Sequence, residues 1–267
     1  MRRKVPFLLL LGYSFAIAQL PNPMSVDKKP LATFEVATIK PSDPNAGGAL
    51  GFYSRPGGRV LLGFAPVRMI VGYAFDIQNF QITGGPNWVG TDRYNIAAIP
   101  PETSVSRTAA QPPIAATPTA EQREMLQALL RDRFAFEYHW QMHDDDVYIL
   151  SRGNKRLELK PPAHPQGDSR GTVVIKSGGI VDGQAFGENI TMPFLAHQLS
   201  GLLKTPVLDQ TGLTGHYDFD LPPSDPENRD ITTAVFDAMD RLGLKLKRGK
   251  GKVDVLVIDH VERPTAD

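Results

Sequence analysis

The sequence predicts an α+β protein made of two related modules, and three patterns support this prediction. Runs in which apolar and polar residues alternate, such as 34–39 and 217–221, are typical of half-buried strands. Apolar residues at helical spacing, such as those between 125 and 130, indicate amphipathic helices. The order helix–strand–strand–helix–strand–strand occurs twice, which indicates an internal duplication with two helices covering each small sheet.

The N-terminal residues have the pattern of a secretory signal peptide. Three basic residues, 2–4, precede an apolar run at 5–17, and the small residues Ala16 and Ala18 fit a cleavage before Gln19. The apolar run is too short for a stable membrane-spanning helix. We therefore expect export to the periplasm or the extracellular space, with no transmembrane segment after cleavage. An uncleaved anchor is the alternative.

Composition narrows the classes of partner and of chemistry. Lys and Arg number 29, as do Asp and Glu, so the net charge is zero and gives no electrostatic case for nucleic acid or anionic membrane. The chain has no cysteine, which excludes disulfides, thiol chemistry and a lipid-anchoring cysteine. An exported protein that relies on its apolar core alone suits the bacterial envelope.

The first module is predicted to span residues 34–160, after a disordered segment at 19–33. Pro66 fits the start of a helix, because the first helical turn leaves its N–H groups without partners. Thr119 and Gln122 have the spacing of a capping box. The expected elements are strands at 34–39, 59–62, 80–82, 93–98, 134–138 and 147–150, helices at 66–74 and 121–133, a Pro-rich loop at 99–118, and a solvated hairpin tip at the acidic residues 144–146.

The second module is predicted to span residues 172–264. Its first helix is expected to be capped by Asn189 or Thr191, and its second ends at Gly243. The expected elements are a hairpin at 172–175 and 179–181, helices at 192–203 and 230–242, a turn at 211–215, and strands at 206–208, 216–221, 244–246 and 253–257.

The two modules can be aligned element by element. Identity is low, and the shared order of elements carries the comparison. The equivalences are 66–74 with 192–203, Tyr94-Asn95-Ile96 with Tyr217-Asp218-Phe219, 121–133 with 230–242, 134–136 with 244–246, and 147–150 with 253–256.

Several segments resemble a soil-associated family of exported bacterial proteins that is built on a domain of unknown function. These segments are the opening at 34–42, Gly-Gly-Pro-x-Trp at 84–88, Leu-Leu-x-x-Arg-Phe at 129–134, Asp-x-Thr-Gly-Leu-Thr-Gly-x-Tyr-Asp-Phe at 209–219, and the ending at 255–264. The likeness covers nearly the whole mature chain and implies no known activity. Some relatives resemble fusions to membrane-bound sensor-type peptidases, which implies a role in sensing or signalling.

The second module is also similar to the short N-terminal domain of secretins and TonB-dependent transducers. The matching pieces are the helix before Val207, the turn at Gly215, the helix at 235–242 and the final strands at 244–246 and 253–258. This resemblance implies a periplasmic module that works by protein–protein contact. No channel or barrel segment accompanies it here.

Catalytic and metal-binding motifs are weak in this sequence. It has no G-x-S-x-G elbow, no H-E-x-x-H and no phosphate-binding loop. His139 and His143, next to the acidic run, suggest a metal site, but we expect a strand end and a turn, where their spacing does not converge. Asp209, Asp218 and Asp220 suggest a glycoside-hydrolysing carboxylate pair. We expect Asp209 to be an Asx-turn residue instead, and the other two to point to solvent.

The resulting hypothesis is a non-catalytic binding, interaction or sensing module of the envelope. Its partner would be an envelope protein or a wall-derived ligand, bound between the modules or at an exposed strand edge. No cofactor, metal or catalytic residue is predicted. The alternative is a secreted hydrolase acting on polysaccharide or cell-wall material. The predicted binding residues are Trp88, Tyr94, Thr211, Gly212, Gly215 and Tyr217.

Overall fold

A computed structural model describes residues 32–43, 50–104, 117–165, 170–173, 185–222 and 230–264. The expected signal peptide, almost all of the segment at 19–33, most of the Pro-rich loop and the strand at 179–181 lie outside these residues. The fold is mixed α+β, as predicted, with five helices and three sheets in the described part of the chain. No described helix is long and apolar enough to cross a membrane.

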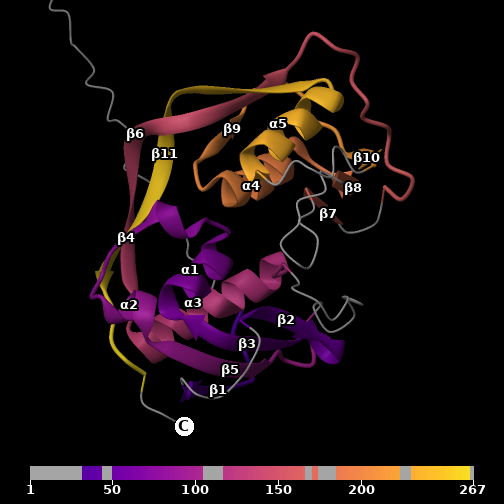
Figure 1. Cartoon of the computed structure of the whole chain (residues 1–267). Helices are drawn as coiled ribbons and strands as arrows, with labels where there is room; N and C mark the ends of the chain where they lie inside the picture. Colours follow the sequence, from indigo (N-terminus) through magenta and orange to yellow (C-terminus); the bar gives the residue numbers. More distant parts are fainter. Residues whose placement is uncertain are drawn as a thin grey trace, which may run out of the picture. The chain divides into compact units, whose positions relative to one another are not determined.

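The first sheet is antiparallel and has the order β1-β5-β3-β2 (Figure 1). Helices α1 and α3 pack against each other and share one apolar core with this sheet. The predicted capping box of α3 is confirmed: the Thr119 hydroxyl accepts the Gln122 N–H at 3.2 Å, and the Gln122 amide oxygen accepts the Thr119 N–H at 3.0 Å. The element bounds are β1 Val36–Pro41, β2 Gly51–Arg55, η1 Pro56–Gly58, β3 Arg59–Pro66, α1 Val67–Phe75, β5 Arg93–Ile99 and α3 Ala120–Phe134.

The second sheet is also antiparallel and has the order β10-β8-β7. Helices α4 and α5 pack into the second apolar core, together with residues of β6, β8, β9, β10 and β11. Helix α4 begins at the Thr191 cap, whose hydroxyl accepts the Phe194 N–H at 3.3 Å, and Asp230 caps α5. The bounds are β7 Arg170–Val173, β8 Ala185–Ile190, α4 Met192–Leu203, β10 Tyr217–Leu221 and α5 Ile231–Arg241.

The third sheet has the order β4-β11-β6-β9 and contains two long strands, β6 (Glu137–Arg152) and β11 (Leu244–His260). They pair antiparallel along their whole length, and Figure 1 shows them side by side. The short strands β4 (Ile82–Gly84) and β9 (Val207–Asp209) run parallel to β11 and β6, respectively. Two short helical turns, η2 (Asn79–Gln81) and α2 (Trp88–Thr91), flank β4.

The long pair corrects three predictions. The acidic run 144–146 is not a hairpin tip but lies inside β6, and the strands predicted on either side of it are one strand. Likewise, the strands predicted at 244–246 and 253–257 are both parts of β11. The physical reason is the cross-strand environment: Asp144 and Asp146 lie opposite Lys252 and Lys250, and the Lys250 Nζ is 2.7 Å from an Asp146 oxygen.

A polar side chain holds a strained backbone position in each of the first two sheets. Phe64 and Asn189 are non-glycine residues with positive φ, 49° and 52°, just before α1 and α4. The Asn95 amide oxygen accepts the Phe64 N–H at 3.0 Å, and a carboxylate oxygen of Asp218 accepts the Asn189 N–H at 2.7 Å. Because positive φ is costly for side-chain-bearing residues, these hydrogen bonds stabilise the two strand-to-helix turns.

The left-handed residues that follow α3 and α5 give a stability prediction. Ala135 has φ 46° and is exposed, whereas Gly243 has φ 78° and a Cβ there would lie 2.4 Å from the Arg156 carbonyl oxygen. We expect Ala135→Gly to raise the free energy of unfolding by about 0.5–1 kcal/mol, because glycine adopts this conformation without strain.

The matched substitution Gly243→Ala should lower the same free energy by about 2 kcal/mol or more, because it adds both strain and a clash. Urea unfolding of the two variants and the wild type measures both effects. A loss of stability in Ala135→Gly would contradict the strain argument.

Candidate functional site

The structure places the first two predicted binding residues in and against the first core. Tyr94 is 4% exposed and meets the Phe134 ring edge-to-face at 5.6 Å, and burial raises the pKa of its phenol. Trp88 is half-buried, with the Arg263 guanidinium 4.9 Å from its ring centroid. Arg263 is in turn held by an Asp92 oxygen at 2.9 Å. These contacts give both aromatic residues a packing role.

The other four predicted residues form a turn beside the second core. An Asp209 oxygen accepts the Thr211 N–H at 2.9 Å, as expected of an Asx turn, and the Thr211 hydroxyl accepts the Leu213 N–H at 3.1 Å. Gly212 has φ 67°, which favours glycine. A Cβ at Gly215 would lie 3.0 Å from the Tyr217 hydroxyl. The six residues therefore form two groups, and their role in binding stays a prediction.

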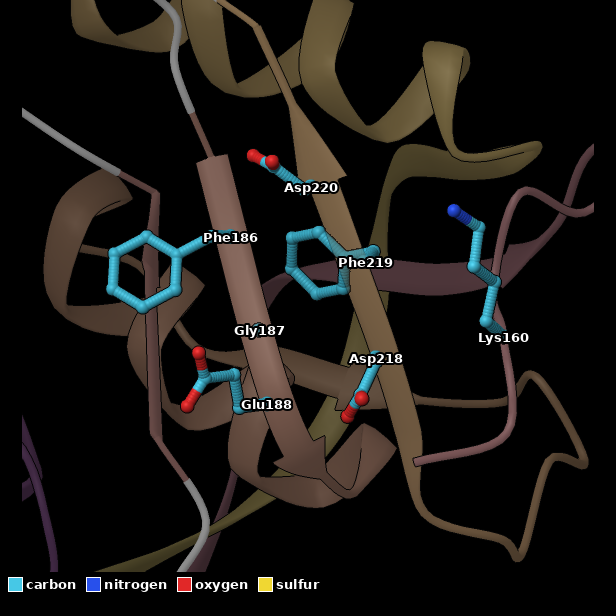
Figure 2. A pocket seen from close by; sticks show the side chains of 7 residues that line it. All are labelled: Lys160, Phe186, Gly187, Glu188, Asp218, Phe219 and Asp220. Atoms are coloured by element: carbon cyan, nitrogen blue, oxygen red, sulfur yellow. The ribbon is translucent and has the colours of Figure 1, made fainter. Parts of the chain in front are cut away.

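A cavity of about 480 Å³ lies over β8 and β10 (Figure 2). Its wall combines charged and aromatic side chains in nearly equal measure, and Figure 2 shows the Phe219 ring directed toward β8. A Cβ at Gly187 would lie 2.5 Å from this ring, so the position requires glycine. None of the six predicted residues lines the cavity. Its lining residues are Lys160, Phe186, Gly187, Glu188, Asp218, Phe219 and Asp220.

The carboxylate of Asp218 is hydrogen-bonded to the backbone around this cavity. Its two oxygens accept the N–H groups of Ala163 and Asn189, each at 2.7 Å, and its own backbone exchanges two hydrogen bonds with Lys160. The two N–H groups hold the pKa of Asp218 below its ordinary value. A general acid in glycoside hydrolysis needs a raised pKa instead. Asp218 therefore suits a structural role better than an acid–base role.

The two histidines of the suggested metal site lie inside β6, not at the predicted strand end and turn. Four residues of strand separate His139 from His143 by roughly 13 Å, so their side chains do not converge. The His139 Nδ1 lies 2.8 Å from an Asp259 oxygen. Among the described residues, no group of three or more acidic or histidine side chains is arranged to hold a metal.

A stripe of large apolar side chains begins at Phe136, just before β6, and continues along one face of β6 at Tyr138, Trp140 and Met142. We call these four residues the aromatic stripe. Exposure rises along it from 5% at Phe136 through 39% and 46% to 60% at Met142. The Phe75 ring at the end of α1 packs against the three aromatic rings, with centroids 4.6–6.2 Å apart. The stripe therefore begins in the first core and ends in solvent.

The outer edge of β6 beside this stripe is not paired with another strand in the described part of the chain. Strand β9 covers β6 only at 148–150, where the Tyr148 N–H and the Leu150 carbonyl bond to Pro206 and Gln210 at 2.8 Å. Backbone groups alternate in direction along a strand, so the even-numbered residues from 138 to 146 also direct their N–H and C=O groups outward. Consistent with this, the Asp146 N–H bonds to the Asp145 side chain rather than to β11.

The outer edge of β11 has a different character. Its residues between 245 and 252 include five cations, and Lys-rich edges discourage the pairing of further strands. The β6 edge has no such lysine between 137 and 146. Thus one edge of the long pair is protected by charge, and the other carries exposed aromatic side chains. The cations of β11 are Lys245, Lys247, Arg248, Lys250 and Lys252.

Sequence reasoning used the alternation at Phe134, Phe136 and Tyr138 but stopped there. The same alternation continues through Trp140 and Met142, so the pattern for one long strand with an exposed apolar face was present. The acidic run that follows has the local pattern of a turn, and it conceals the continuity of the strand.

Comparison with known proteins gives one match. The family model described as a protein of unknown function, DUF3738, matches residues 68–261, which is more than half of the chain. No curated protein and no solved structure matches significantly.

The role of Asp218 gives a second prediction. Asp218→Asn should lower the free energy of unfolding at pH 7 by about 1–3 kcal/mol, because an amide cannot accept both N–H bonds. The pKa of Asp218 is lowered in the folded state. Its contribution is therefore fully present above the unfolded pKa of about 3.9, and it is lost as pH falls through the folded pKa.

Urea unfolding of both proteins between pH 2 and 7 tests this: the difference in stability should be constant above about pH 5 and shrink below it. The control is Asp220→Asn, which changes an exposed carboxylate two residues away. Equal losses in the two variants would contradict a specific role for Asp218.

Proposed function

The chain belongs to the DUF3738 family of proteins of unknown function, and we propose that it is a non-catalytic interaction protein of the bacterial envelope. It recruits a partner by strand addition to the outer edge of β6. The observation that carries this proposal is the aromatic stripe beside an edge that is open in the described part of the chain. In strand addition, main-chain hydrogen bonds give affinity and alternate side chains give specificity, and both are available here.

The envelope location rests on the N-terminal sequence. The basic residues, the apolar run and the small residues before Gln19 support export to the periplasm or beyond. The chain without cysteine is compatible with either compartment. A sensing role, as in the relatives that resemble fusions to sensor-type peptidases, would use the same recruitment of a partner.

The internal duplication is part of this proposal, and the strand pairings support it. When the short turns η1, η2 and α2 are left out, the order β-β-α-β-β-α-β occurs from β2 to β6 and again from β7 to β11. In the first copy, β2 and β5 flank β3, the strand that leads into α1. In the second copy, β7 and β10 flank β8, the strand that leads into α4. The short strand after that helix then pairs with the last strand of the other copy, β4 with β11 and β9 with β6.

Two further equivalences support the duplication. Asn95 and Asp218, aligned from the sequence, make the same hydrogen bond to Phe64 and Asn189. The left-handed residues Ala135 and Gly243 end the second helix of each copy. Matching these two residues sets Phe136 against Leu244 and Val147 against Val255. The sequence alignment sets Phe136 against Leu246 and Val147 against Val253, so each of these equivalences changes by two residues.

The hydrolase alternative finds little support in the placement of its residues. Asp209 accepts a backbone N–H within a turn, and Asp218 accepts two backbone N–H groups, so neither is available as the acid or the nucleophile. Asp220 is exposed on β10.

The test is a pull-down of the mature chain, residues 19–267, from envelope extract with identification by mass spectrometry. Met142→Pro should reduce capture of the partner at least about tenfold. Proline removes an outward N–H and places its ring in the path of an added strand, while the ladder to β11 keeps its bonds.

Met142→Ala is the matched control, because it removes the side chain but keeps the N–H; it should retain part of the binding. Circular dichroism and urea unfolding verify that both variants fold. A partner captured equally by Met142→Pro would contradict strand addition at this edge. Retention on wall polysaccharide with release of soluble sugar would instead favour the hydrolase.

A further inference from the structure

The geometry of the β6 edge also restricts what can be added to it, and this inference rests on the proposed function. We infer that the occupant is a segment of another protein, about eight residues long, with apolar side chains at alternate positions and a lysine or arginine at the end that meets Asp144 and Asp145. Three features of the edge lead to this description: its length, its two faces and its charge.

The length follows from what closes each end of the edge. At one end the Phe136 N–H bonds to the Leu130 carbonyl at 3.3 Å, and at the other β9 begins to pair at Tyr148. Between them, outward backbone groups run from Tyr138 to Asp146. Eight residue steps of extended chain cover about 27 Å. An added strand of about eight residues therefore fills the open edge.

The alternation follows from the two faces of β6. On one face an added strand meets Tyr138, Trp140 and Met142, which are 39%, 46% and 60% exposed. On the opposite face it meets His139 and the other odd-numbered polar residues, Gln141 and His143. Cross-strand neighbours lie within about 5.5 Å, so side chains of the added strand contact these residues directly. Apolar residues fit the first face and polar residues the second.

The charge preference follows from the acidic run. Lys250 and Lys252 face Asp146 and Asp144 from the β11 side of the strand. An added strand lies on the other side of β6, so the carboxylates are the nearest charges it meets. Asp145 lies opposite Gly251, which offers it no side chain. A cation on the added strand is therefore favoured here, and an acidic residue is disfavoured.

The same charges disfavour a second copy of β6 as the occupant. An antiparallel pairing of two β6 edges that fills residues 138–146 is centred on Met142, and it sets Asp144 and Asp146 against Trp140 and Tyr138 of the other copy, so neither carboxylate meets a lysine or arginine. A parallel pairing in register stacks the acidic runs on each other. Like charges directly opposite destabilise a strand pair, so a different segment is preferred.

The experiment uses Trp140 as a reporter. The chain has two tryptophans, so the mature chain carrying Trp88→Phe leaves Trp140 as the only tryptophan. The probes are two eight-residue peptides of alternating valine and threonine, one with lysine at the first position and one with lysine at the last. Matched probes carry glutamate instead of lysine, a scrambled order, or N-methyl groups on alternate residues.

We expect one of the two lysine peptides to shift the Trp140 emission to the blue. The glutamate version should bind about five- to tenfold more weakly at low salt, and the difference should shrink as salt screens the charges. N-methylation should abolish binding in one of the two alternate phases only, because only one edge of the peptide bonds to β6. Met142→Pro should also abolish it.

The outcomes separate the two proposals. Equal binding of the lysine and glutamate peptides, lost on N-methylation and in Met142→Pro, would overturn the charge inference and keep strand addition. If no peptide binds, but Met142→Pro no longer captures the partner from extract, the inference about charge is likewise overturned and strand addition is kept. Equal binding of the scrambled peptide would overturn the inferred alternation of side chains, and equal binding of the peptides N-methylated in either phase would overturn strand addition itself. Self-association of the mature chain that Met142→Pro abolishes would overturn the inference of a different protein as occupant.

Discussion

The antiparallel pairing of β6 with β11 is the interaction on which the rest of the described structure depends. One end of the pair contributes Leu256 and Ile258 to the first core, and Phe136, just before β6, belongs to the same core. The other end contributes residues to the second core, among them Leu150 and Leu246. A two-stranded ribbon is marginal by itself in water. Burial of both ends in apolar cores is what allows the middle to stay paired.

The charges along the middle of the pair contribute little to its stability. Lys250 and Asp146 are 73% and 81% exposed, and ion pairs at such sites are worth about 0–1 kcal/mol. Their effect is on register, because a shift of one residue would turn the apolar stripe to the other face. The backbone ladder and the two buried ends hold the ribbon together. The short strands β4 and β9 cover only those ends, which leaves the aromatic part of β6 open among the described residues.

Two of the carboxylates that suggested chemistry, Asp209 and Asp218, bond to backbone N–H groups instead. Asp209 and Thr211 shape a turn, Asp218 supports the left-handed Asn189, and Gly187 makes room for a ring. The segment from 209 to 219, one of those that carry the family resemblance, is therefore explained to a large extent by local geometry. Function is better sought where side chains are exposed without a structural need, and the far end of the aromatic stripe meets that condition.

The sequence by itself determined the local elements: the capping box of α3, the helices of both halves, the Asx turn at Asp209 and the α+β class. These depend on contacts between residues a few positions apart, which leave a pattern in the chain. The continuity of β6 and β11 was decided only by tertiary structure. Asp144–Asp146 and the glycines near 250 have the local signature of turns, and only the pairing of two segments that lie about a hundred residues apart in the chain makes them strand. The open edge was likewise not predictable, because whether a strand has a second neighbour depends on how far β4 and β9 extend along the sheet.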